Sequence, residues 1–116
     1  MAWHNTYGKY GEEKVFHYLL DQGFLILDRN WRVGRLELDF VVLDGEELVV
    51  VEVKTRLRGE EYPEELLSYK KRKNLLLAGS AYLAYHKIQR EIRFDLLLLT
   101  GAEMRVEHIR NAIDTF

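Results

Sequence analysis

Apolar and polar residues alternate along the chain with two different periods, which predict a mixture of helices and strands. Apolar side chains fall on one helical stripe over residues 5–22, and Gly23 is a suitable end for this first helix. A second helix is predicted over residues 64–86. The segments with strand-like patterns are residues 24–31, 36–43, 48–54, 92–99 and 104–109.

The order of these segments predicts an α/β fold. It runs helix, three strands, helix, two strands, and the central strands are apolar enough to need helices over the sheet. We therefore expect a mixed sheet of about five strands flanked by helices. The 116 residues suit a single domain spanning 1–116, because two separate cores would each be small.

Composition excludes some kinds of site. The chain has no cysteine, so thiolate metal sites, cysteine nucleophiles and disulfides are ruled out. No apolar run reaches the roughly 18 residues of a membrane span, and the first residues lack the pattern of a signal peptide. We therefore expect a cytoplasmic protein that does not bind membranes. The net charge of −2 argues against coating of nucleic acid but leaves room for local basic patches.

Acidic residues cluster on two neighbouring predicted strands. Glu37 and Asp39 are two positions apart, as are Glu52 and Lys54, so each pair shares a face of its strand. Asp44–Gly45 between the strands is a strong hairpin signal. A loop of Asp44 and Gly45 alone would set Glu37 opposite Glu52, and a loop from Asp44 to Glu47 would set Asp39 opposite Glu52. Both keep the four side chains on one face, whereas a three-residue loop or a bulge would separate them.

Two interpretations of this acidic cluster are open. Carboxylates about 5 Å apart repel by roughly 3 kcal/mol at an effective dielectric of 20, and a divalent cation removes that cost. Mg²⁺ is held by one or two carboxylates with water and phosphate oxygens, so Asp39 and Glu52 would bind the metal and Lys54 would assist the attacking water. Alternatively, the acids form a solvated strand face that arginines such as Arg32 and Arg56 neutralise.

The sequence resembles a known family of nucleases. An Asp followed on the next strand by Glu-x-Lys is the core signature of the PD-(D/E)XK superfamily, and the wider pattern is similar to its YraN-like family. The resemblance implies a restriction-endonuclease-like fold and cleavage of DNA that depends on Mg²⁺ or Mn²⁺. The matching segments are Gly8-x-x-Gly11-Glu12, Asn30-x-Arg32, Glu37-x-Asp39, Val51 to Arg56, Arg93-Phe94-Asp95 and Val106 to Ala112.

The resemblance also implies roles for further residues. In junction-resolving relatives a Glu of the first helix completes the acidic site, which here is Glu12, and Glu37 would be another accessory acid. Lys71 best matches a basic position on the second helix, and Lys70 and Lys73 are close alternatives for that position. A Holliday junction is the implied substrate, and a homodimer would suit it because two strands must be cut symmetrically. The residues expected to contact phosphate are Lys70, Lys71, Lys73, Arg56 and Arg58.

Two positions depart from the family pattern. Leu36 stands where the family usually has Gly, and Leu38 replaces the proline that precedes the Asp in the superfamily. Together with the near-neutral charge, these departures support a rival hypothesis of a non-catalytic nucleic-acid-binding or adaptor domain. The clustered acids argue against this rival hypothesis, because carboxylates that face phosphate do not strengthen binding to nucleic acid.

Overall fold

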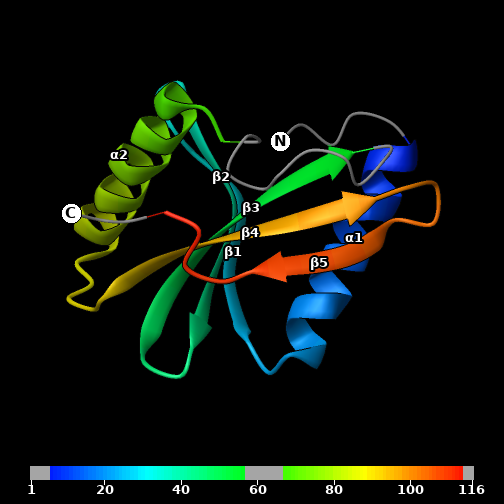
Figure 1. Ribbon diagram of the computed structural model, residues 1–116. Helices are drawn as coiled ribbons and strands as arrows, with labels where there is room; N and C mark the ends of the chain where they lie inside the picture. The colour runs from blue at the N-terminus through cyan, green and yellow to red at the C-terminus, as the bar shows by residue number, and fades with distance from the viewer. Residues whose placement is uncertain (1–5, 57–66, 114–116) are drawn as a thin grey trace.

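A mixed five-stranded sheet flanked by two helices forms the part of the chain that this computed structural model describes, residues 6–56 and 67–113 (Figure 1). The predicted order of helix, three strands, helix and two strands is confirmed. Neither helix is both long and apolar enough to cross a membrane. In chain order the elements are α1 (Thr6–Asp21), β1 (Leu25–Val33), β2 (Leu36–Asp44), β3 (Glu47–Arg56), α2 (Tyr69–His86), β4 (Ile92–Thr100) and β5 (Arg105–Ile109).

The strands lie in the sheet in the order of the sequence, β1-β2-β3-β4-β5. All neighbours are antiparallel except β3 and β4, which are parallel. Parallel neighbours need a crossover connection, usually a helix, and α2 lies in the connection between these two strands. The sheet therefore combines a β1–β2–β3 meander with a crossover through α2 and a final β4–β5 hairpin (Figure 1).

Each face of the sheet is buried against one helix. On one face, Phe94, Leu96 and Leu98 of β4 pack in a cluster that includes residues of α2. On the other face, Leu97 and Leu99 pack in a cluster that includes residues of α1. Burial on both faces explains the nearly continuous apolar sequence of β3 and β4. A strand with one solvated face would instead alternate apolar and polar residues.

The hairpin between β2 and β3 settles the register that the sequence left open. Asp44 pairs with Glu47 and Phe40 with Val51, so the turn itself consists of residues 45 and 46. Gly45 has a φ of 63°, which a two-residue hairpin turn requires and which glycine adopts without a steric cost. Continued outward, this register brings Asp39 towards Glu52, which is the second of the two arrangements expected from the sequence.

The second helix begins later than predicted. Leu67 and Ser68 are not helical, and Ser68 is the N-cap residue of α2: its backbone is extended and its hydroxyl accepts a hydrogen bond from Lys71 N at 3.1 Å. Serine is favoured there because its side chain satisfies an amide that has no partner within the helix. Residues 64–66, where the predicted helix starts, lie outside the described residues, as does the loop predicted over 57–63.

Candidate functional site

The backbone is irregular at the point where Asp39 lies. β1 and β2 pair Trp31 with Leu38, so Asn30 and Asp39 face each other at the next step of the register. Asn30 has a φ of 56°, in the left-handed region that Asn tolerates better than most residues. Leu38 belongs to the α2-side cluster, whereas Phe40 belongs to the α1-side cluster. Residues two apart on a regular strand share a face, so the alternation fails at Asp39.

Asp39 is fully buried at this irregularity. The β2–β3 ladder ends at Phe40 and Val51, and beyond it Oδ2 of Asp39 accepts a hydrogen bond from the backbone N of Val53 at 2.9 Å. The side chain of Asp39 thus provides the acceptor for the amide of Val53, which lies beyond the last backbone pair between β2 and β3. This bond fixes the position of Asp39 relative to β3, the strand that carries the second carboxylate.

Glu52 approaches the same region from β3. Its neighbours Val51 and Val53 pack on the α1 side, so by alternation Glu52 points to the α2 side, where its Oε2 lies 3.0 Å from Nζ of Lys71. Glu52 is only 3% exposed, and its other oxygen, Oε1, is buried without a hydrogen-bond partner in the structure. A buried acceptor without a partner is costly, so this oxygen is a position at which a cation would be stabilising.

The charges of these side chains act on one another. Burial, and next the negative charge of Glu52, raises the pKa of Asp39 to about 7. Burial alone would lower the pKa of Lys71, but Glu52 above all, with Asp39 and Glu37, raises it above its usual range. Three carboxylates from two strands therefore act on one ammonium group. Asp39, Glu52 and the adjoining Lys71 together form the carboxylate site.

The two predicted accessory acids lie near this site and have partners of their own. Oε1 of Glu12 on α1 accepts a hydrogen bond from Nδ2 of Asn30 at 3.0 Å, which places α1 beside the residue that faces Asp39. Glu37 forms an ion pair with Arg32 at 3.3 Å. Both acids thus contact side chains of β1.

The basic residues divide into two groups. Lys70 and Lys73 are exposed on α2, and Lys54 is half-buried two positions after Glu52 on β3. The side chain of Arg56, by contrast, is only 7% exposed and donates hydrogen bonds to Thr100 Oγ1 and Glu107 Oε1, each at 2.9 Å. These bonds tie β3 to β4 and β5, which favours a structural role for Arg56. Arg58 lies outside the described residues.

The carboxylate site fits a hard divalent cation. Over residues 6–56 and 67–113 no three His, Asp or Glu side chains group as metal ligands, so the site offers the pair Asp39 and Glu52. Mg²⁺ needs only one or two carboxylates when water and substrate phosphate supply its other ligands. The buried Oε1 of Glu52, which has no hydrogen-bond partner in the structure, is the position that such a cation would occupy.

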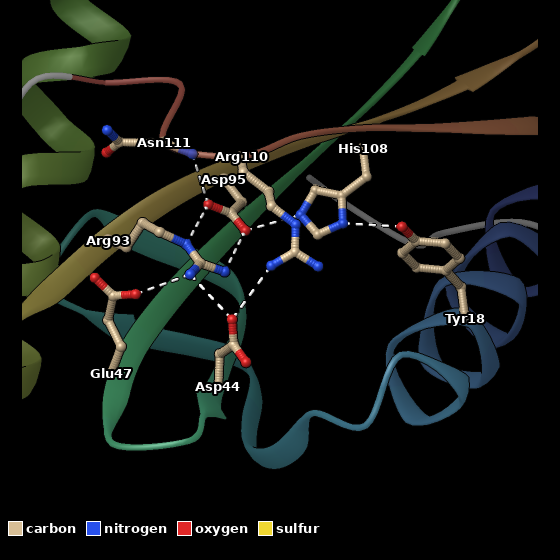
Figure 2. A network of polar contacts seen from close by, with 8 residues as sticks. All are labelled: Tyr18, Asp44, Glu47, Arg93, Asp95, His108, Arg110 and Asn111. Atoms are coloured by element: carbon tan, nitrogen blue, oxygen red, sulfur yellow. Dashed lines mark hydrogen bonds and ion pairs between the residues drawn. The ribbon is translucent and has the colours of Figure 1, made fainter.

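Sequence reasoning missed a second polar centre, which Figure 2 shows around Asp95. The buried carboxylate of Asp95 accepts hydrogen bonds from Arg93 at 2.9 and 3.0 Å, from the backbone N of Asn111 at 2.9 Å, and is 2.8 Å from Nε2 of His108. His108 Nδ1 lies 2.9 Å from the hydroxyl of Tyr18 on α1. The one local signal was an Arg and an Asp two apart on a strand.

The electrostatics of Asp95 are opposite to those of Asp39. Burial alone would raise the pKa of Asp95, but hydrogen bonds from His108 and Arg93 lower it below its usual range. Arg93 also bonds Asp44 at 3.0 Å and Glu47 at 2.8 Å. The centre thus joins the β2–β3 hairpin to β4, β5 and α1 with its charges paired (Figure 2). The carboxylate of Asp95 and the guanidinium of Arg93 both have hydrogen-bond partners, so this centre holds the surrounding strands and α1 together.

Comparison with known proteins places this arrangement in a family. Residues 11–99, which include Asp39, Glu52 and Lys71, match the family described as "Uncharacterised protein family UPF0102". A UPF0102 protein of Bacteroides thetaiotaomicron is 42% identical over 115 residues, or 97% of this chain and 95% of its own. Another, from Nitratidesulfovibrio vulgaris, is 41% identical over 111 residues, or 92% of this chain and 83% of its own. The chain therefore belongs to the UPF0102 family, the YraN-like family that its motifs resemble.

Proposed function

We propose that the chain is a divalent-metal-dependent DNA endonuclease of the restriction-endonuclease-like kind. The observation that carries the proposal is the buried pair Asp39 and Glu52, in which Glu52 contacts Lys71 through one oxygen and keeps the other buried without a hydrogen-bond partner. A carboxylate pair of this kind is costly in a structural role, and a bound cation removes the cost.

The chemistry follows from the positions of the side chains. Asp39 and Glu52 would hold Mg²⁺ or Mn²⁺, and such a metal would supply a Lewis acid for a phosphoryl oxygen and lower the pKa of bound water. Lys54 orients the attacking water and stabilises the charge that develops on the phosphate. In the net reaction the oxygen of that water would bond to phosphorus, the bond from phosphorus to one sugar oxygen would break, and one proton of the water would end on the leaving sugar oxygen, which gives a phosphate monoester and a free hydroxyl. Glu12 and Glu37 support the site through Asn30 and Arg32.

The exposed cations of α2 support DNA as the substrate. Lys70 and Lys73 flank Lys71, which contacts Glu52, so a phosphate backbone that reaches the carboxylate site passes these lysines. Phosphate contacts of this kind release counterions and make affinity fall steeply with salt. The proposed substrate is branched DNA such as a Holliday junction, for which a homodimer would supply two sites related by symmetry.

A cleavage assay tests the proposal. Wild type is incubated with linear, flapped and four-way DNA in Mg²⁺, in Mn²⁺ and in chelator, beside Asp39→Asn, Glu52→Gln and the exposed control Glu91→Gln. We expect metal-dependent products from wild type and from Glu91→Gln, and no products from the two site variants. Absence of cleavage by wild type on all three substrates with either metal would contradict the proposal.

One observation favours a second candidate, a non-catalytic nucleic-acid-binding or adaptor domain. The ion pair between Lys71 and Glu52 at 3.0 Å already neutralises part of the carboxylate charge without a metal. Under this alternative, DNA binds equally well in chelator and in Mg²⁺, and Asp39→Asn leaves DNA binding unchanged. The cleavage assay and a binding titration on the same samples therefore separate the two candidates.

A further inference from the structure

A pocket of about 550 Å³ opens between α2 and the segment that follows β5. Figure 1 shows that segment turning back from β5 towards the helix. The volume lies within the roughly 300–1,000 Å³ of small-ligand sites. The described residues that line the pocket are Tyr69, Arg72, Lys73, Leu76, Asn111, Ala112 and Ile113.

The α2 wall of the pocket combines an aromatic ring with two cations. Positions 69, 72, 73 and 76 follow the spacing of one helical stripe. Tyr69 is 74% exposed, and Arg72 and Lys73 are exposed and form no ion pair with the described acids. Leu76 is half-buried, and Ile113 supplies a buried apolar surface opposite the helix. A flat apolar ligand that carries negative charge at its edge would satisfy all of these groups.

The pocket and the carboxylate site share the first turn of α2 but lie on different sides of it. Lys71 projects to Glu52, whereas Tyr69 and Lys73, each two residues away, are turned by about 200° around the helix axis from Lys71. The two sites are therefore separated by roughly the thickness of a helix with its side chains, about 10–12 Å. A single strand whose phosphate reaches Glu52 and Lys71 would cross this turn of α2 and present a nearby nucleotide to the pocket.

We propose that the pocket binds one unpaired base of the DNA, stacked on Tyr69, with its flanking phosphates on Arg72 and Lys73; this rests on the proposed function. Aromatic platforms beside cations are the usual means of binding single-stranded nucleic acid, because every base has a face that can stack. Within a duplex both faces of a base are already stacked on its neighbours. The pocket thus selects substrates with an unpaired nucleotide near the cut, such as a flap or an open junction.

The test measures binding in chelator, where cleavage does not occur. Single-stranded oligonucleotides that contain 2-aminopurine are titrated with the full chain, and fluorescence anisotropy and quenching of the 2-aminopurine are recorded. Loss of one base stack lowers affinity by roughly 5- to 150-fold, so we expect a decrease in that range for Tyr69→Ala, with loss of quenching. Tyr69→Trp should keep both. Tyr85→Ala is the matched control, because Tyr85 is also 74% exposed and lies near the other end of α2.

The outcomes separate this pocket from the nuclease proposal. Loss of single-strand affinity in Tyr69→Ala alone supports the pocket, whether or not wild type cleaves DNA. Equal affinities of wild type and Tyr69→Ala, or equal losses in Tyr69→Ala and Tyr85→Ala, overturn the pocket and leave any metal-dependent cleavage standing. Absence of quenching in wild type at low salt also overturns it, and this measurement needs no variant to fold.

Discussion

Nζ of Lys71 lies 3.0 Å from Oε2 of Glu52, and this ion pair connects the first turn of α2 to the middle of β3. The two side chains differ in exposure to solvent: Glu52 is 3% exposed, whereas Lys71 is 34% exposed. Glu52 therefore depends on Lys71 for neutralisation, while Lys71 also interacts with solvent. Asp39 adds a second negative charge that acts on the same ammonium group.

Replacement of Lys71 by Met should destabilise the fold in chelator. It leaves Glu52 buried and unpaired beside Asp39, a loss that costs about 3–5 kcal/mol for a fully buried pair. Because Lys71 is one-third exposed, solvent screening reduces the expected loss to about 1–3 kcal/mol. Urea unfolding measures the change, with Lys70→Met, the exposed neighbour, as control. Equal stabilities of the two variants would contradict the prediction.

A metal should restore part of that loss if the carboxylate site binds one. A cation at Glu52 Oε1 would replace the missing ammonium charge, so Mn²⁺ should stabilise Lys71→Met more than it stabilises Lys70→Met. If Lys71→Met is destabilised but Mn²⁺ has the same effect on both variants, the ion pair is structural and the metal site is not supported.

The sequence was sufficient for the element order and for the face of β3. The Val51 and Val53 pattern, read with strand alternation, put Glu52 on the side opposite these valines, which is where α2 lies. The hairpin register stayed ambiguous because Asp44 and Gly45 are compatible with more than one loop length. The pairing of Asp44 with Glu47 depends on the whole ladder rather than on the turn residues.

Other features depended on contacts between distant segments. The left-handed backbone of Asn30 and the failure of alternation at Asp39 could not be read from β2, in which apolar and polar residues alternate from Leu36 to Phe40. Asp95 gathers partners from β4, β5 and the residues after β5, so the spacing of Arg93 and Asp95 alone does not reveal this polar centre. The acids at the start of the predicted second helix favoured an early beginning, but Ser68 provides the cap that the helix uses.

Replacement of Asp95 by Asn should destabilise the fold by about 3 kcal/mol. The change leaves Arg93 without its buried carboxylate, which is the costly way to break a buried ion pair. Because the pKa of Asp95 is lowered by folding, its contribution is present above its ordinary pKa of about 4 and is lost as the pH falls through the lower value of the folded state. The variant's stability should therefore fall less than that of wild type below about pH 4.

Chemical denaturation from pH 2.5 to pH 7 measures this difference, with the exposed control Glu91→Gln beside it. The control should follow the wild-type curve throughout. A variant that is as stable as wild type at pH 7 would show that Asp95 does not hold the hairpin, β5 and α1 together.

Replacement of Gly79 by Ala should destabilise the fold although Ala is the better helix former. A Cβ at this position would lie 2.8 Å from Cζ of Phe94 and 2.9 Å from Cδ1 of Ile92, so these side chains or α2 itself have to shift. Overpacking of this kind costs about 1–3 kcal/mol, against a gain in helix propensity of about 1 kcal/mol. Thermal melts decide the sign, with the exposed neighbour Ser80→Ala, which should be neutral or slightly stabilising, as control. A higher melting temperature for Gly79→Ala would contradict the close approach of α2 to β4.

The last prediction separates a metal site from a structural ion-pair cluster. Asp39 and Glu52 repel when both are ionised, which is the condition above the raised pKa of Asp39 at about 7. At pH 8 in chelator, Asp39→Asn should therefore keep or raise the melting temperature, and its side-chain oxygen can still accept the bond from Val53 N. Relief of about 1 kcal/mol corresponds to roughly 4 °C in a domain of this size.

Added Mn²⁺ or Mg²⁺ should stabilise wild type, because a ligand that binds only the folded state adds about 2.7 kcal/mol at a concentration one hundred times its Kd. Asp39→Asn should lose that gain in stability, because the variant lacks one of the two ligand carboxylates. Glu91→Gln should keep the gain. If the acids serve only as partners of cations such as Lys71, the signs reverse: Asp39→Asn would melt lower in chelator, and metal would have little effect on either protein. That pair of results would reject the metal site at Asp39 and Glu52 and favour the adaptor, because a carboxylate pair that needs no cation cannot be the centre of metal-dependent cleavage.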